Sequence, residues 1–144
     1  MLTFGNELII LFLCNNINLS SQMKKIIYID DEFLNLELFK INLRTNYEVI
    51  VADSPFKALE IIEKENLDVI ITDYKMPEMN GMELIEKVKS DIRPKAVCMI
   101  LSGYLESDVS TDKSKVFKYI MKPYKKDQMI EYIETAFSQI SSSV

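Results

Sequence analysis

The stretch Ile70–Gly81, IITDYKMPEMNG, sets one carboxylate, Asp73, directly after an apolar run and follows it with Met-Pro and Asn-Gly. The run Asp68–Thr72 is short and almost continuously apolar, as expected for a strand covered on both faces of a parallel sheet. Pro and Asn-Gly are typical of a loop, and Gly81 is expected to supply its last turn. Asp73 is therefore expected where a buried strand ends.

Apolar runs of this kind recur and alternate with longer segments of helical periodicity. The predicted strands are Lys25–Ile29, Tyr47–Ala52, Asp68–Thr72, Ala96–Leu101 and Phe117–Met121. The predicted helices are Glu32–Arg44, Ser54–Glu65, Gly81–Ser90, Leu105–Val116 and Lys125–Ile140. This alternation predicts an α/β fold with an open, doubly wound sheet of five parallel strands and five helices.

The local sequence signals for a helix are strong in Ser54–Glu65 and weak in Leu105–Val116. Ser54 is a good N-cap and Pro55 suits the first helical position. Leu105–Val116 has few apolar residues and several Ser, Thr and Asp side chains, which compete for the backbone hydrogen bonds of a helix. The helix there is expected to be short or loose.

The composition excludes several classes of function. The chain has 144 residues, 48% of them hydrophobic, which suits one domain. A net charge of -5 argues against direct binding to nucleic acid or to an anionic membrane. The absence of His excludes the usual zinc sites and Ser-His or Cys-His catalytic pairs. Only two cysteines occur, Cys14 and Cys98, which fits a reducing, cytoplasmic setting.

The first 22 residues precede a second plausible start at Met23, so the expected division is an extension, 1–22, and a domain, 23–144. The apolar run Leu8–Cys14 is too short to span a bilayer and lacks the basic flank of a secretory signal. Two interpretations stay open: a disordered or misassigned start, and an apolar segment that docks on the domain or on a second copy.

Five polar residues end the predicted strands, namely Asp30, Asp31, Asp73, Ser102 and Lys122. Ligands of open parallel sheets bind beyond these ends. Converging carboxylates repel each other, by about 4 kcal/mol for two charges about 4 Å apart at an effective dielectric of about 20. Either protonation or a hard divalent cation such as Mg²⁺ must relieve this. With Lys122 added, the set suits phosphoryl transfer onto Asp73.

Four motifs in this order, IYIDDE, ITDYKMPEMNG, LSGY and YIMKPY, make the segment from about Lys24 to Ile140 resemble the receiver domain of two-component response regulators. The resemblance implies a flavodoxin-like fold with strand order 2-1-3-4-5. The step from Ser102 to Lys122 is slightly shorter than is usual in that family.

The resemblance also implies a role for each residue. Asp73 would accept phosphate from a sensor histidine kinase or a histidine phosphotransfer protein. Mg²⁺ or Mn²⁺ would be held directly by Asp31, Asp73 and the backbone carbonyl of Lys75, and mainly through water by Asp30. Lys122 would pair with one phosphoryl oxygen.

Ser102 and Tyr119 match the switch positions of the family. The Ser102 hydroxyl would bind another phosphoryl oxygen, and Tyr119 would turn inward when Ser102 moves. The resemblance also implies a cis peptide bond before Pro123. Lys75 and Tyr104 flank the expected site.

Because the chain ends soon after the last predicted helix, the expectation is a stand-alone response regulator that is a phosphoacceptor and not an enzyme. Whether it relays phosphate or binds an unknown target protein, and whether it forms a homodimer, stays open. One alternative is an aspartyl-phosphate phosphatase of the haloacid dehalogenase type, although that family carries an Asp-x-Asp pair after its first strand. The other is a degenerate receiver that serves only as an interaction module.

Overall fold

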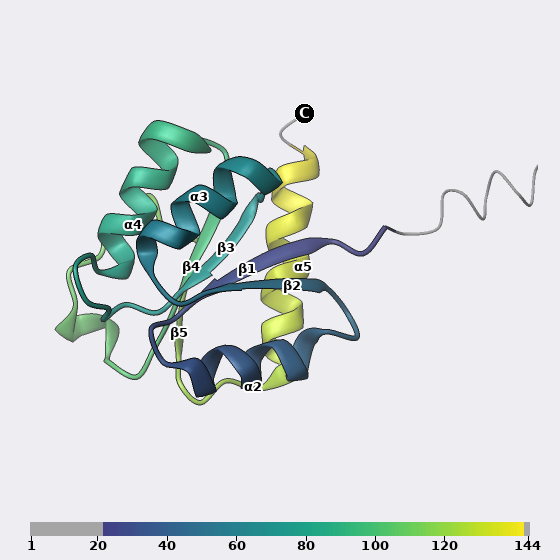
Figure 1. The fold of residues 1–144 in the computed structure, drawn as a ribbon, viewed down its shortest axis with the longest axis horizontal. Helices are drawn as coiled ribbons and strands as arrows, with labels where there is room; N and C mark the ends of the chain where they lie inside the picture. Colours follow the sequence, from purple (N-terminus) through teal and green to yellow (C-terminus); the bar gives the residue numbers. More distant parts are fainter. Residues whose placement is uncertain (1–21, 143–144) are drawn as a thin grey trace, which may run out of the picture.

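The structure is a computed structural model that describes residues 22–142. Its strands form one parallel sheet in the order β2-β1-β3-β4-β5 (Figure 1). Their bounds are β1 Lys25–Ile29, β2 Glu48–Ala52, β3 Val69–Thr72, β4 Val97–Ser102 and β5 Lys118–Met121. The predicted class and strand order are confirmed.

Helices cover both faces of this sheet. They are α2 (Phe33–Leu43), α3 (Pro55–Glu65), α4 (Gly81–Lys87) and α5 (Lys126–Ser142). Two core clusters result, one beneath α2 and α5 and the other beneath α3 and α4 (Figure 1). Neighbouring residues of a strand point to opposite faces, so that Ile26 and Tyr28 enter the first cluster, while Ile27 and Ile29 enter the second. This double burial explains why the strands are apolar throughout.

Local capping explains where two of the helices begin. The Ser54 hydroxyl accepts a hydrogen bond from the Lys57 N–H at 3.2 Å, and Pro55 occupies the first turn, as predicted. Asn80 and Glu83 form a reciprocal capping box at the start of α4. The predicted helix Gly81–Ser90 leaves α-helical geometry after Lys87 and continues as a π-helical turn, Val88–Ile92.

The predicted helix Leu105–Val116 is wrong. Within it the structure has only a 3₁₀ turn, Glu106–Asp108. The Asp112 carboxylate accepts hydrogen bonds from the Ser114 N–H at 3.0 Å and the Ser114 hydroxyl at 2.6 Å. The Asp112 carbonyl accepts the Lys115 N–H at 3.0 Å. These side-chain bonds support a turn in place of a helix, so the part of the chain that the structure describes has four α-helices where five were predicted.

The predictions for the N-terminal extension, including Leu8–Cys14, fall on residues 1–21, outside the described range. Between residues 22 and 142, none of the helices combines the length and apolarity that crossing a bilayer requires.

Candidate functional site

The sheet itself brings the predicted residues together at its carboxyl edge. The backbone ladder continues one residue beyond the strands, since the Asp73 N–H donates to the Ile29 carbonyl at 2.8 Å. On the other side, the Lys122 N–H donates to the Ser102 carbonyl at 2.8 Å. Asp73 is therefore placed beside the end of β1, and Lys122 beside Ser102 at the end of β4, although these residues are far apart in the sequence.

Three carboxylates and one ammonium group meet at this edge. One carboxylate oxygen each from Asp30, Asp31 and Asp73 lies within 4.8 Å of the others. The Lys122 Nζ lies 2.8 Å from Asp30 Oδ2 and 3.4 Å from Asp73 Oδ1. These charged groups adjoin a cavity of about 540 Å³, and Asp31, Asp73 and Lys122 are among the residues that line it. With one ammonium for three carboxylates, the cluster favours a further cation.

Asp30 is the buried anchor of the cluster. It is fully buried, and a buried carboxylate is costly unless it is hydrogen-bonded. Asp30 accepts hydrogen bonds from the Tyr28 hydroxyl at 2.6 Å, the Glu32 N–H at 2.9 Å and the Asn35 side chain at 3.1 Å. Burial raises the pKa of Tyr28, and the hydrogen bond to Asp30 raises it further. The Tyr28 hydroxyl therefore keeps its proton and remains a hydrogen-bond donor.

Sequence reasoning missed these partners of Asp30. Tyr28 stands two residues earlier on the same strand face, and Asn35 lies in the first turn of α2. The alternation was visible in the sequence. The tertiary contacts were not.

Asp73 sits in a less compensated environment. Its side chain is 13% exposed, and burial raises its pKa to about 6. The charge of Lys122 opposes that rise and the charge of Asp30 adds to it. For Lys122, burial acts to lower the pKa, but the hydrogen bond to Asp30 and the charges of Asp73 and Asp30 raise it above its ordinary value. Lys122 therefore stays an ammonium group.

Two residues of adjacent loops face each other across the mouth of the cavity. The Lys75 Nζ donates to the Tyr104 hydroxyl at 3.2 Å and lies 5.4 Å from the centre of the Tyr104 ring. Both side chains are among those that line the cavity. Lys75, predicted to offer its backbone carbonyl, thus also contributes its side chain here.

Ser102 and Tyr119 are both tied to the backbone of Tyr104. The buried Ser102 hydroxyl accepts the Tyr104 N–H at 3.2 Å. The Tyr119 hydroxyl donates to the Tyr104 carbonyl at 2.7 Å. The Lys122–Pro123 peptide bond is cis, as the resemblance implied.

Gly81 holds the loop after Asp73 close to the sheet. Its N–H donates to the Tyr74 carbonyl at 2.7 Å, and a Cβ there would clash with the Asp73 carbonyl. No glycine in the described range has a positive φ. Gly81 is thus required because its Cα lies close to the Asp73 carbonyl. The turn conformation that was expected to require a glycine is not the reason.

The parallel sheet and the acidic cluster at its carboxyl edge together define a receiver-type α/β domain. The family model for the response regulator receiver domain matches residues 26–134, and the chain belongs to this family.

Known relatives agree with this assignment. Chemotaxis protein CheY1 of Helicobacter pylori (strain ATCC 700392 / 26695) is 34% identical over 116 residues, which cover 76% of this chain and 94% of that protein. The hydrogenase transcriptional regulatory protein HoxA of Bradyrhizobium diazoefficiens is 31% identical over 114 residues, 77% of this chain. The chain spans only about a quarter of the length of HoxA, with 23% covered.

Solved structures show the same fold. A response regulator receiver domain protein from Clostridium thermocellum has a TM-score of 0.79 and 30% identity, and the match covers 85% of this chain and 100% of that chain. A CheY-like receiver domain protein from Methanospirillum hungatei JF-1 has a TM-score of 0.74 and 32% identity over 84% of this chain and 99% of that chain.

Proposed function

We propose that this protein is a cytoplasmic phosphoacceptor of a two-component system, and that Asp73 accepts a phosphoryl group from a phosphohistidine of a kinase or phosphotransfer protein. The observation that carries this proposal is the convergence of three carboxylates within 4.8 Å of one another, with the Lys122 Nζ 3.4 Å from Asp73. In the transfer, a carboxylate oxygen of Asp73 attacks phosphorus, an O–P bond forms, and the P–N bond breaks. The imidazole nitrogen leaves with the electron pair.

A divalent metal ion fits the donor set. Clustered carboxylate oxygens are the ligands that Mg²⁺ and Mn²⁺ prefer, and the cluster has excess negative charge. Asp31, Asp73 and the Lys75 carbonyl would hold the ion, and Asp30 would act mainly through water. When bound, the ion supplies charge compensation for the phosphoryl oxygens.

Lys122 supplies the second positive charge. Its ammonium group already lies between Asp30 and Asp73, and it can pair with a phosphoryl oxygen on Asp73 while it keeps the 2.8 Å contact with Asp30. Asp30 is the positioning residue in this account, since its other hydrogen bonds hold it fixed.

The response to phosphorylation would start at Ser102 and Tyr119. For the Ser102 hydroxyl to bind a phosphoryl oxygen, the loop that now donates the Tyr104 N–H to it must shift. The same loop holds the Tyr119 hydroxyl through the Tyr104 carbonyl. Phosphorylation would therefore bias both contacts at once, as expected of a two-state switch.

The face of α2 beside the cavity suits a protein phosphodonor. Phe33, Leu34, Leu38 and Ile41 are between 50% and 73% exposed. Leu34, Leu38 and Ile41 follow helical spacing and form an apolar stripe on the outer side of α2. Glu32 and Asn35, at the start of the helix, line the acidic cavity. A helical donor seated on the stripe would have its phosphohistidine near Asp73.

The proposal is tested by incubating the protein with Mg²⁺ and acetyl phosphate and following its intact mass. We expect one added phosphoryl group on the wild type and none on Asp73→Asn. Treatment with hydroxylamine should remove the group, because it cleaves an acyl phosphate. Asp31→Asn should need far more Mg²⁺ for the same labelling.

Three outcomes would redirect the assignment. Equal labelling of Asp73→Asn would reject Asp73 as acceptor. No labelling together with no binding of divalent cations would favour the degenerate receiver. Sustained turnover of many phosphomonoesters would favour the phosphatase, which the strand order already disfavours because Asp73 follows the third strand and not the first.

A further inference from the structure

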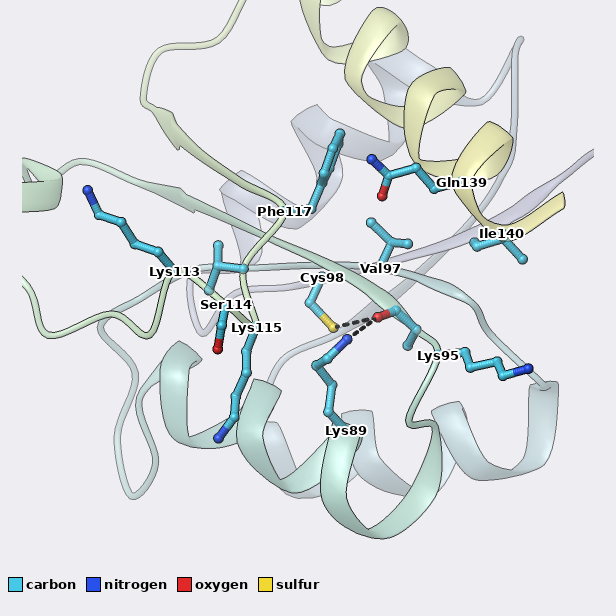
Figure 2. Close-up of a pocket in the computed structure, with 12 residues that line it drawn as sticks. Lys89, Lys95, Val97, Cys98, Lys113, Ser114, Lys115, Phe117, Gln139 and Ile140 are labelled. Carbon is cyan, nitrogen blue, oxygen red and sulfur yellow. Dashed lines mark hydrogen bonds between the residues drawn. The ribbon is translucent and has the colours of Figure 1, made fainter. Parts of the chain in front are cut away.

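A second cavity lies at the opposite, amino end of the sheet. It measures about 600 Å³ and opens between the π-helical turn, the start of β4, the segment before β5 and the end of α5 (Figure 2). The strands are parallel, so this cavity is separated from Asp73 by the length of β4.

The side chains around this cavity carry charge of one sign. Four lysines line it, Lys89, Lys95, Lys113 and Lys115, and its lining contains no acidic residue. The whole chain, in contrast, has 22 acidic residues against 17 basic ones. Such a concentration of ammonium groups in an acidic protein predicts an anionic ligand.

These lysines are only weakly engaged by carboxylates. In residues 22–142, neither Lys89 nor Lys95 forms an ion pair, and the Lys89 Nζ donates to the Ala96 carbonyl at 2.8 Å. Lys113 and Lys115 have carboxylate oxygens no closer than 3.7 Å. Exposed pairs of this length contribute little, so an incoming anion can replace them.

The lysines surround the hollow from several elements. In Figure 2 the Lys89 amine points inward, beside Cys98 and the Ala96 carbonyl, while the side chains of the other three lysines extend outward from the rim in different directions. Rim lysines on flexible stems can turn toward a bound anion. The Lys89 amine has two further N–H donors for it.

An adjoining cavity of about 340 Å³ shares Lys95, Ala96 and Ile140 with the first and is also lined by Arg93 and Asp68. The Arg93 Nε is buried and has no hydrogen-bond acceptor among the described residues. Buried donors are rarely left unpaired. The Arg93 Nη2 lies 3.6 Å from the Asp68 carboxylate, so Arg93 adds a cation to this end of the sheet whose charge Asp68 partly offsets.

Part of the cavity rim comes from the segment in which a helix was expected. Lys113, Ser114 and Lys115 lie in the segment where a helix was expected, and the hydrogen bonds of Asp112 hold that segment in a turn. In this turn, the basic segment lies at the rim of the hollow.

From this geometry we propose that the cavity binds a compact polyphosphate anion of nucleotide size, such as the triphosphate chain of a nucleoside triphosphate. Its volume lies in the range of about 300–1,000 Å³ that is typical of small-molecule sites. Lysines bind phosphate oxygens as point charges. Val97, Phe117 and Ile140 provide an apolar wall against which a base can pack.

The test is calorimetric titration of the full chain with ATP, tripolyphosphate and adenosine in buffer that contains EDTA, so that the acidic site recruits no magnesium complex. We expect ATP and tripolyphosphate to bind at a single site and adenosine not to bind. The double substitution Lys95→Glu with Lys113→Glu should weaken binding by about tenfold or more, because it reverses two charges at the rim. Lys64→Glu, on an exposed turn of α3, is the matched control and should leave the affinity unchanged.

The outcomes distinguish binding of a nucleotide from binding of a phosphate chain alone. They also test this cavity independently of phosphorylation at Asp73. Tighter binding of ATP than of tripolyphosphate, lost in Phe117→Leu, assigns a nucleotide, and equal binding assigns the phosphate chain alone. Asp73→Asn should bind as the wild type does. The proposal is overturned if neither phosphate compound binds at millimolar concentration, if the lysine substitutions have no effect, or if a polyglutamate peptide binds more tightly than both.

Discussion

At the scale of single residues, the Asp73 carboxylate has fewer compensating partners than the Asp30 carboxylate. Asp30 is buried more deeply, but it receives hydrogen bonds from four donors, including Lys122. Burial raises the pKa of Asp73 to about 6, the charge of Asp30 adds to this rise, and Lys122, which Asp73 shares with Asp30, only partly offsets it. A carboxylate that lacks compensation binds a cation or an electrophile more readily than one whose partners are complete.

This environment predicts how stability depends on pH without metal. Because the pKa of Asp73 is raised from 3.8 in the unfolded chain to about 6 in the fold, the native state binds the proton more tightly. The contribution of Asp73 to stability is therefore greatest below about pH 4 and is lost as pH rises through about 6. In EDTA at pH 7.5, Asp73→Asn should be more stable than the wild type by about 1–3 kcal/mol in urea unfolding, and by less at pH 4.

Asp53→Asn is the control for that comparison. A hydrogen bond from Lys57 lowers the pKa of Asp53, so loss of this carboxylate should not stabilise the protein at pH 7.5. Adding Mg²⁺ should raise the stability of the wild type and leave Asp73→Asn nearly unchanged. A wild type that is the more stable protein at pH 7.5 in EDTA would contradict this account of Asp73.

At the scale of elements, the loop from Asp73 to Gly81 couples the site to the start of α4. The capping box of Asn80 and Glu83 fixes where the helix begins, and the close approach of Gly81 presses that end against the Asp73 backbone. The position of the Asp73 side chain therefore depends on how tightly α4 packs.

Two glycines provide a matched test of this coupling. Gly81→Ala should destabilise the protein by about 1–3 kcal/mol, because the added Cβ forces Asp73 and the loop apart. It should also weaken Mg²⁺ binding. Gly103→Ala, where a Cβ meets open space, should stay within about 0.5 kcal/mol of the wild type. Equal effects in urea unfolding would show that close packing at Gly81 is unimportant.

The secondary structure was predictable where local signals agreed. The strand ends were predicted within a residue, and Ser54 with Pro55 identified the start of α3. The prediction failed at Leu105–Val116, where the Asp112 side chain competes with the helical hydrogen bonds. The sequence shows that polar residues compete with the helix there. It does not show whether their side-chain hydrogen bonds are stronger than the backbone hydrogen bonds of a helix.

At the scale of the whole molecule, two cores on opposite faces hold the sheet. Among the described residues, their buried members run from Ile26 in β1 to Ala136 in α5. The candidate residues of the acidic site stand at the carboxyl edge of the sheet that these cores enclose.

This arrangement predicts that a chain starting at Met23 folds and functions. Its thermal midpoint should equal that of the full chain within about 1 °C, since about 1 kcal/mol would shift a domain of this size by several degrees. Labelling by acetyl phosphate should also be unchanged. A large drop in the midpoint would show that residues 1–22 dock on the domain, which is the interpretation that their apolar run leaves open.

The sequence by itself determined most local features of this protein: the five strands, four of the five predicted helices, the cap of α3, and which polar residues end the strands. These features rest on periodicity and on contacts between near neighbours in the chain. Only the tertiary structure decided that Tyr28 and Asn35 anchor Asp30, that Lys122 lies between Asp30 and Asp73, and that lysines from separate elements surround one cavity. The physical reason is that pairing across a parallel sheet joins residues many positions apart, and no local pattern encodes their distance.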